Sequence, residues 1–429
     1  MSGVERWPRE QLRALQLPRL RATVERVLGG AAPLGDRLRA AGVESAGAVK
    51  SLDDLAALPF TEKADLREHY PFGLLAVPRE QLVRLHASSG TGGKPTVVGY
   101  TAGDLDVWAE VMARCMAMAG VRPGMLVHNA NGYGLFTGGL GFHHGAERLG
   151  ATILPVSVGQ TKRQVMLLCD LQAQVLCATP SYAVTIAEAL EDEGIGPDEL
   201  SLEVGLFGAE PWSEPMRDEL ERRLGLRARN CYGLSEIIGP GVAMECEAGT
   251  GSHVNEDHFL VEVLDPDTSE PVAAGEPGEL VITTLTKEAL PLLRYRTADI
   301  AAVDAAPCAC GRTLARMGQV HGRRDDMLIL RGVNVFPSAV REVVAGFAPA
   351  VSGVIAIRPR ARGIKQAPPL PVVVELAEGQ PPAAGLADAI RARLRDALVV
   401  STEIELAPWA SLPRSDYKSK LVDWTGAET

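Results

Sequence analysis

Residues 82–101 read LVRLHASSGTGGKPTVVGYT, which places a loop of small and hydroxyl-bearing residues between two β-prone runs. The pattern predicts a strand, a glycine-rich loop and a second strand. Such a loop suits phosphate binding, because small residues let backbone N–H groups approach the oxygens while hydroxyls and the Lys94 ammonium add charge-assisted hydrogen bonds. A solvated hairpin turn is the alternative interpretation.

The loop departs from the Walker pattern of nucleotide-binding loops at two positions. A Walker loop requires glycine where this chain has Ser88, and serine or threonine where it has Pro95. Pro95 and the β-branched run after it also remove the helix whose N-terminus a Walker loop uses. The segment 132–137 fails as a dinucleotide fingerprint, because its sixth residue is Thr137 rather than glycine. A nicotinamide cofactor is therefore disfavoured.

Outward from this loop, short apolar runs alternate with helical patterns along most of the chain. The strand-like runs are 125–128, 152–155, 175–178 and 204–207, and the clearest helical patterns are 181–193 and 213–224. This alternation predicts an α/β fold with a parallel sheet. Residues 8–70 have an amphipathic helical pattern. Residues 259–285 read as β-strands joined by turn residues, which predicts a more antiparallel subdomain.

The chain is long enough for more than one domain, because 429 residues exceed the roughly 250–300 at which a single core usually divides. We predict a large domain over 1–324 and a smaller α+β domain over 325–429, called the lid below. Within the lid, strands are predicted near 354–358, 372–375 and 403–406, and a helix near 386–398.

The balance of charge excludes some partners. Lys and Arg number 43 against 54 Asp and Glu, a formal net charge of −11, so no broad positive field faces a phosphate backbone or an anionic membrane. No stretch approaches the roughly 18 apolar residues of a membrane-spanning helix. We therefore expect a cytoplasmic protein with no nucleic acid and no membrane partner.

Two further segments carry chemistry that suits a nucleotide. Residues 231–236 (CYGLSE) place an aromatic ring, a hydroxyl and a carboxylate on a tight glycine turn after a strand-like run. An aromatic ring can stack on adenine, and a carboxylate can hold Mg²⁺ against phosphate oxygens. Asp299, at the end of another β-prone segment, offers a carboxylate for a ribose diol. A buried loop with a capping serine is the alternative for 231–236.

Taken together and in this order, these segments resemble the adenylate-forming superfamily, and more closely its phenylacetate–coenzyme A ligase family. The resemblance runs from Trp7 to Asp423 and rests on long strings: HASSGT at 86–91, YGLFTGGLG at 133–141, GAEPW at 208–212, RYRT at 294–297 and RGVNVFPS at 331–338. It implies the adenylate-forming fold, in which a large α/β domain with a β subdomain carries a small mobile lid. It also implies an ATP-dependent aryl or arylacetyl acid–CoA ligase that forms an acyl adenylate and then a thioester.

The resemblance implies a role for each matching residue of the nucleotide site. The phosphates would be cradled by Ser89, Gly90, Thr91, Gly93 and Lys94. The adenine side would be lined by Gly208, Ala209, Glu210 and Pro211, called the adenine loop below. Tyr232 would stack, next to Gly233 and Ser235, and Glu236 would hold Mg²⁺. Asp299 would take the ribose hydroxyls, and Arg323 would contact ribose or phosphate.

The resemblance also implies that the lid rotates between the two reactions about a hinge at Asp325. A lysine delivered by the lid would stabilise the charge that develops on phosphate, and Lys418 matches it. Tyr417 stands where the family usually has glycine, which leaves Lys420 as a substitute. The expected catalytic residues are thus Lys418, Glu236, Lys94 and Arg323.

The implied acyl pocket combines the glycine-rich segment 131–141, called the acyl segment below, with other loops. Its expected residues are Asn131, Tyr133, Gly134, Phe136, Ala209, Ile237 and Pro240, and a place in the core is the alternative for Tyr133 and Phe136. The chain departs from the family at Asn131, where tyrosine is usual, and at Val158, where glycine is usual. Asn131 opens space and adds hydrogen-bonding groups, so we predict an acid with a polar ring substituent such as hydroxyl or amino. A turn of this amide toward the backbone is the alternative.

The seven cysteines are too sparse for a secreted disulfide framework. Three of them and one histidine offer the ligand set of a closed structural zinc site: Cys246, Cys308, Cys310 and His253. Cys-x-Cys is tighter than the usual ligand spacing, so the residues alone leave buried free thiols as an equal alternative. Similar residues recur in the resembled family, which implies structural Zn²⁺. The other cysteines and the pair His143-His144 are predicted to be structural.

Two other functions fit the same residues. A standalone adenylating enzyme would load the aryl acid onto an acyl or peptidyl carrier protein, because the loop 331–337 would face either pantetheine thiol. A zinc-stabilised binding protein would have kept the fold and lost catalysis, against which the intact Lys94 and Glu236 argue. The expected cofactors are ATP, Mg²⁺, coenzyme A or carrier-protein phosphopantetheine, and Zn²⁺. The expected partners are an aromatic carboxylic acid and, in a homodimer, a second copy of the chain.

Overall fold

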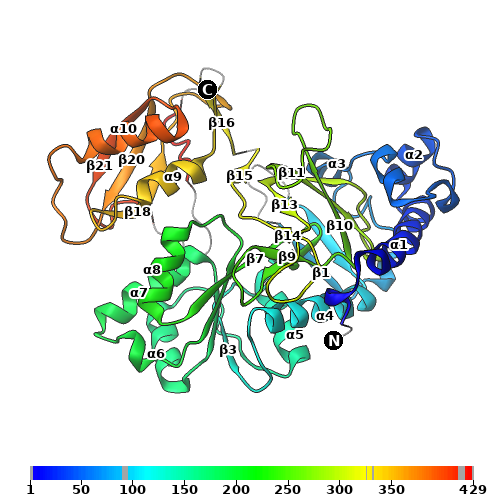
Figure 1. The fold of residues 1–429 in the computed structure, drawn as a ribbon, viewed down its shortest axis with the longest axis horizontal. Helices are drawn as coiled ribbons and strands as arrows, with labels where there is room; N and C mark the ends of the chain where they lie inside the picture. Colours follow the sequence, from blue (N-terminus) through cyan, green and yellow to red (C-terminus); the bar gives the residue numbers. More distant parts are fainter. Residues whose placement is uncertain (1–2, 89–94, 325, 331–332, 414–420, 428–429) are drawn as a thin grey trace.

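The computed structural model describes residues 3–88, 95–324, 326–330, 333–413 and 421–427. Figure 1 shows a large N-terminal part, coloured blue to yellow, and a smaller C-terminal part beside it, coloured yellow to red. Strand β15 (Gly322–Arg323) pairs with β12 (Tyr295–Ala301) of the large part, whereas β16 (Leu328–Leu330) pairs with strands of the lid. The domain boundary predicted after residue 324 lies in the interval between β15 and β16.

A nine-stranded sheet forms the centre of the large part. Its parallel strands lie in the order β4-β3-β5-β6-β7, and β8, β9, β14 and β13 continue it antiparallel. The strands are β3 (Leu126–Asn129), β4 (Thr152–Leu154), β5 (Val175–Ala178), β6 (Val204–Gly208), β7 (Arg227–Leu234), β8 (Ile238–Glu245), β9 (Ser252–Val254), β13 (Val303–Asp304) and β14 (Arg316–Met317). The predicted parallel sheet and its four strand-like runs are confirmed.

Helices cover both faces of this sheet. They are α4 (Ala102–Met118), α5 (Gly138–Leu149), α6 (Thr161–Leu171), α7 (Pro180–Asp192) and α8 (Glu214–Leu224). In β5, Leu176 packs in the core formed with α6, α7 and α8, while its neighbour Cys177 packs in the core formed with α4 and α5. Successive side chains of a strand point to opposite faces, so a sheet buried on both faces requires the continuous apolar runs seen in the sequence.

The N-terminal segment is only partly helical. Helices α1 (Arg9–Gly29), α2 (Ala32–Ala40) and α3 (Lys63–Glu68) follow the predicted pattern, but Ala46–Ala48 and Leu52–Ala57 form short 3₁₀ turns. Leu58 is extended, with a ψ of 145°, because the residue before a proline avoids the helical conformation. Further 3₁₀ turns lie at Val4–Arg6, Arg79–Gln81 and Pro197–Glu199.

Antiparallel strands complete the large part. Strands β1 (Arg84–Ala87) and β2 (Val97–Tyr100) pair antiparallel, so the two predicted strands are confirmed, while residues 89–94 of the loop predicted between them lie outside the described residues. A four-stranded antiparallel sheet contains β10 (Phe259–Leu264), β11 (Gly278–Thr284), β12 and β15. This sheet confirms the antiparallel subdomain predicted from the turn residues of that segment.

The lid has a hydrophobic core of its own, to which Val340, Val374 and Ile390 belong. Besides β16, its elements are β17 (Val333–Val335), α9 (Pro337–Ala345), β18 (Val351–Ile357), β19 (Lys365–Gln366), β20 (Leu370–Leu376), α10 (Leu386–Leu398) and β21 (Thr402–Ala407). They form the sheets β17-β16-β19 and β18-β20-β21. The strands and the helix predicted for the lid are confirmed. Within the described chain, no helix is long and apolar enough to cross a membrane.

Candidate active site

Three of the predicted nucleotide-site residues meet between β7, β12 and β15. Tyr232 donates its hydroxyl proton to Asp299 Oδ2 across 2.7 Å, and Arg323 Nη1 donates to Asp299 Oδ1 across 2.9 Å. Asp299 lies directly opposite Arg323 in the strand register. Burial, together with the Asp299 carboxylate, raises the pKa of Tyr232 well above its usual value, so the phenol stays neutral and donates. An oriented carboxylate of this kind can accept hydrogen bonds from two ribose hydroxyls.

The position of Tyr232 differs from the sequence expectation. β7 continues to Leu234, and Tyr232 pairs with Ala243 of β8, so the tyrosine lies on a strand and not on a turn. A Cβ at Gly233 would lie 2.5 Å from the Ile238 carbonyl oxygen, so glycine lets the two strands close tightly. The expectation of a turn was wrong because Gly233 continues the strand instead of ending it.

The adenine loop follows β6 at the carboxyl end of the parallel strands, where open α/β sheets bind ligands. A Cβ at Gly208 would lie 2.2 Å from the carbonyl oxygen of Cys231, so this close approach of β6 to β7 requires glycine. Ala209 has a φ of 72°, a left-handed backbone that is strained for alanine. Glu210 accepts hydrogen bonds from the Ser181 backbone N–H, across 2.7 Å, and from the Ser181 hydroxyl. These contacts hold the loop in one conformation.

The turn between β7 and β8 carries Glu236, the predicted Mg²⁺ ligand. Glu236 is 6% exposed, and its carboxylate has no hydrogen-bond or ion-pair partner in the part of the chain that the structure describes. Nearby, Lys287 Nζ donates to the Ile237 carbonyl across 2.6 Å and lies 4.1 Å from the centroid of the Tyr100 ring. Burial lowers the pKa of Lys287 to about 8, an effect that Asp104 and Glu236 oppose. The free carboxylate is suited to a hard cation such as Mg²⁺.

The acyl segment lies against the turn that carries Glu236. The hydroxyl oxygens of Thr137 and Ser235 are 3.5 Å apart, and a Cβ at Gly141 would lie 2.7 Å from Pro240 Cδ. Of the predicted pocket residues, Ile237, Pro240 and Asn131 are buried, Tyr133 and Phe136 are partly exposed, and Gly134 and Ala209 are exposed. The structure thus brings together the two segments that the sequence analysis assigned to one pocket.

A polar network, centred on Asn129, organises the acyl segment. Asn129 Nδ2 donates to the Tyr133 hydroxyl across 2.8 Å, and Asn129 Oδ1 accepts from the Asn131 backbone N–H at 3.3 Å and from Asn131 Nδ2 at 3.2 Å. The Tyr133 hydroxyl also lies 3.2 Å from His143 Nδ1. The Asn131 amide therefore turns toward another side chain and not toward the backbone. Its Oδ1 has no hydrogen-bond partner among the described residues.

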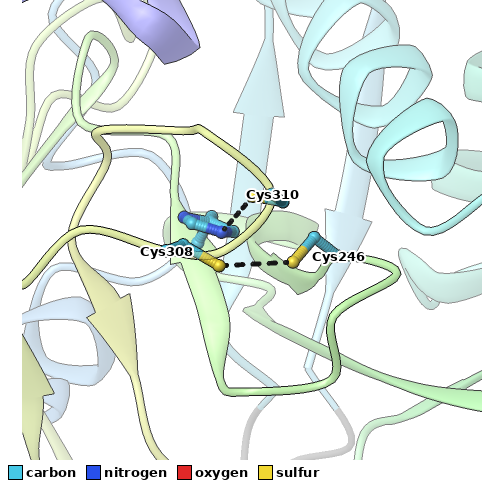
Figure 2. Close-up of side chains that lie close together, drawn as sticks. Cys246, Cys308 and Cys310 are labelled. Carbon is cyan, nitrogen blue, oxygen red and sulfur yellow. Dashed lines mark hydrogen bonds between the residues drawn. The ribbon is translucent and has the colours of Figure 1, made fainter.

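The predicted zinc ligands come together from three elements (Figure 2). Cys246 Sγ and Cys308 Sγ are 3.8 Å apart, Cys310 Sγ is 3.4 Å from His253 Nε2, and all four ligand atoms lie within 4.8 Å of one another. Zn–S bonds of about 2.3 Å in a tetrahedron place two sulfurs about 3.8 Å apart. His253 Nδ1 donates to the Leu314 carbonyl across 3.0 Å, which leaves the Nε2 lone pair for a metal. These residues therefore fit a closed zinc site.

Several predicted site residues lie outside the described part of the chain: Ser89, Gly90, Thr91, Gly93, Lys94, Asp325, Lys418 and Lys420. Their roles remain predictions. Two charged residues beside the site escaped the sequence analysis, namely Lys287 under the Glu236 turn and Arg341 on α9, which donates to the Pro211 carbonyl. No sequence pattern marked them, because burial of a charge depends on contacts between distant segments.

Comparison with known families covers both parts of the chain. Residues 23–286 match the AMP-binding enzyme family, and residues 332–423 match the AMP-binding enzyme C-terminal domain. The chain is 51% identical to a phenylacetate-coenzyme A ligase of Thermus thermophilus, with 96% of each chain covered. It is 46% identical to a phenylacetate-coenzyme A ligase of Escherichia coli, with 96% of this chain and 94% of the relative covered.

Comparison with solved structures identifies the same architecture. A 2-hydroxyisobutyryl-CoA ligase in the postadenylation state superposes with a TM-score of 0.91 at 28% identity, over 98% of this chain and 91% of that chain. The same ligase in the thioesterification state, with CoA bound, gives a TM-score of 0.74 at 29% identity over the same shares. The present structure therefore superposes better on the postadenylation structure of that ligase than on its thioesterification structure.

Proposed function

The chain belongs to the AMP-binding enzymes, and within them to the phenylacetate–coenzyme A ligase family, and we propose on this premise that it joins an aromatic carboxylic acid to coenzyme A using ATP. It is an AMP-forming acid–thiol ligase of the adenylate-forming fold. The observation that carries the proposal is the meeting of Tyr232, Asp299 and Arg323 beside the adenine loop. Three distant segments there hold one carboxylate ready for a nucleotide.

The proposed reaction has two steps. A carboxylate oxygen of the acid attacks the α-phosphorus of ATP, the bond to the bridging oxygen of the β-phosphate breaks, and pyrophosphate leaves. The thiol sulfur of coenzyme A then attacks the acyl carbonyl carbon, gives up its proton and displaces AMP. The nucleoside end of ATP is bound in both steps, so a rigid ribose and adenine site contributes mainly by orientation.

In the first step, different residues of this chain would bind the ribose, the Mg²⁺ and the phosphates of ATP. Asp299 would accept hydrogen bonds from the ribose hydroxyls, in an orientation fixed by Tyr232 and Arg323. Bound Mg²⁺ would screen the phosphate charge, and Glu236 fits as its ligand because no cationic side chain among the described residues is bonded to its carboxylate. Lys94 and Lys418 are proposed for the phosphates and for the charge that develops during attack.

The proposed acid carries a polar ring substituent. Asn129 anchors the Asn131 amide through its nitrogen, and a hydroxyl or amino group on the ring would donate to the remaining Oδ1. We expect wild-type protein to prefer hydroxy or amino derivatives over phenylacetate and benzoate in kcat/KM, and Asn131→Tyr to remove that preference. A wild-type protein that favours unsubstituted phenylacetate would refute this part of the proposal.

The proposed Zn²⁺ is structural. Four protein ligands close the coordination shell, so no open position is available for water or substrate. Cys246 directly follows β8 and His253 lies on β9, whereas Cys308 and Cys310 come from the loop between β13 and β14. The metal would tie these segments together. The metal would act only as a cross-link and would take no part in the reaction.

The decisive assay is ATP–pyrophosphate exchange with a panel of aromatic acids, followed by detection of the thioester with coenzyme A. Exchange that depends on an aromatic acid, together with acyl-CoA formation, is the expected result. Exchange with no acyl-CoA, but with loading of a carrier protein, would favour the standalone adenylating enzyme. Absence of exchange with every acid would favour a non-catalytic binding protein.

A further inference from the structure

A buried arginine joins the lid to the nucleotide site. Arg341, on α9, is 8% exposed, and its Nη2 donates to the carbonyl of Pro211 in the adenine loop. Burial lowers the pKa of Arg341, an effect that Glu210 and Glu342 oppose. The guanidinium nonetheless remains charged near neutral pH, because arginine is not deprotonated in proteins. A desolvated charge of this kind is favourable only where nearby acceptors compensate it.

The surrounding contacts connect the same face of the lid to the Asp299 site. Helix α9 contacts α8 and β15, and β15 carries Arg323, the partner of Asp299. Ser338 Oγ donates to the His321 carbonyl just before β15. A Cβ at Gly322 would lie 2.7 Å from Phe336 Cδ1, so the lid packs closely on this strand. Figure 1 shows α9 on the side of the lid that faces α8.

The contact of Arg341 depends on the orientation of the lid. The acceptor at Pro211 belongs to the large domain, whereas Arg341 moves with α9. A lid that rotates away from the adenine loop must break this hydrogen bond and expose the guanidinium to water. The orientation described here superposes better on a postadenylation structure than on a thioesterification structure of the same ligase.

We infer that Arg341 is a positioning residue for adenylation: its hydrogen bond to the adenine loop holds the lid in the orientation that forms the acyl adenylate. The inference rests on the proposed function, because it requires two half-reactions. Arg341 does not touch the reacting atoms in this account. It acts by favouring one lid orientation and by fixing the carbonyl of Pro211, next to Glu210, beside the nucleotide.

The test separates the two half-reactions in the full-length protein. Arg341→Met keeps most of the side-chain length and removes the charge, Arg341→Lys keeps the charge, and Arg393→Met removes an exposed arginine from α10 of the same lid. ATP–pyrophosphate exchange reports adenylation, and thioester formation from preformed acyl adenylate and CoA reports the second step. Thermal unfolding is measured for every variant.

We expect Arg341→Met to lose about tenfold in exchange, the effect of about 1.4 kcal/mol, while thioester formation from preformed adenylate is retained. Arg341→Lys should recover part of the exchange rate, and Arg393→Met should match wild type in both assays. Equal losses in both half-reactions, or none, would overturn the inference while leaving the proposed function intact. A wild-type protein without exchange activity would overturn both.

Discussion

The hydroxyl of Tyr232 offers a direct test of the nucleotide site. Tyr232→Phe removes one O–H group and leaves the ring, so any stacking on adenine is preserved. The lost hydrogen bond runs to Asp299 Oδ2 across 2.7 Å, and Asp299 is 6% exposed, so water cannot fully replace the donor. The substitution therefore perturbs the orientation of the carboxylate proposed to bind ribose.

The size of the effect follows from the remaining contacts of Asp299. A hydrogen bond to a charged group contributes about 1.5–3 kcal/mol. Arg323 Nη1 still holds Oδ1 at 2.9 Å after the substitution, so we expect the lower end of this range. About 1.4 kcal/mol corresponds to a tenfold change in affinity. The KM for ATP should therefore rise about tenfold, with a smaller change in kcat.

The assay is ATP–pyrophosphate exchange at varied ATP and saturating acid. Tyr182→Phe is the matched control, because Tyr182 is 1% exposed and its hydroxyl donates to the Gly159 carbonyl across 2.9 Å, on helix α7. Both variants should lose some thermal stability, whereas only Tyr232→Phe should raise the KM for ATP. An unchanged KM in Tyr232→Phe, or an equal rise in the control, would refute the assignment of Asp299.

Three other outcomes are expected. Gly208→Ala should lower the free energy of unfolding in urea by about 1–3 kcal/mol, because the added Cβ would lie 2.2 Å from the Cys231 carbonyl oxygen. Gly29→Ala is the control and should not lower it, because no atom lies within 4 Å of a Cβ at Gly29. The pKa of Lys287 in the folded protein, about 8, lies below its ordinary value of 10.5, so its contribution to stability is present above pH 10.5 and is lost as the pH falls through 8. The difference in unfolding free energy between wild type and Lys287→Met should therefore change by roughly 3 kcal/mol over that interval. A difference that does not vary with pH would contradict this prediction. Metal analysis should find one zinc per chain, and both chelation and Cys310→Ser should remove the zinc and lower the Tm. A protein without zinc, in which the cysteines of the cluster are freely alkylated in the folded state, would contradict the site.

Much of the fold could be predicted because the apolar residues that mark a strand or a helix in the sequence are also the ones that the fold buries. The apolar run at 175–178 became β5 with Leu176 and Cys177 packed on opposite faces, as a parallel sheet covered on both sides requires. The prediction was wrong where a proline or a close pairing of strands overrides the local pattern. The segment 52–57 carried helical spacing but forms only a 3₁₀ turn before Pro59, and Tyr232 lies on a strand because its glycine neighbour permits close strand pairing.

For the candidate site, the residue types could be predicted, but their arrangement in space could not. The amino-acid sequence by itself determined the order of strands and helices, the cysteine and histidine ligand set and the strings that place the chain in its family. Only the tertiary structure decided that Tyr232 and Asp299, 67 positions apart, share a hydrogen bond, and that Lys287 and Arg341 are buried charges beside the site. The physical reason is that periodicity reports the local backbone and its apolar face, whereas the free energy of a buried charge depends on which distant groups meet it.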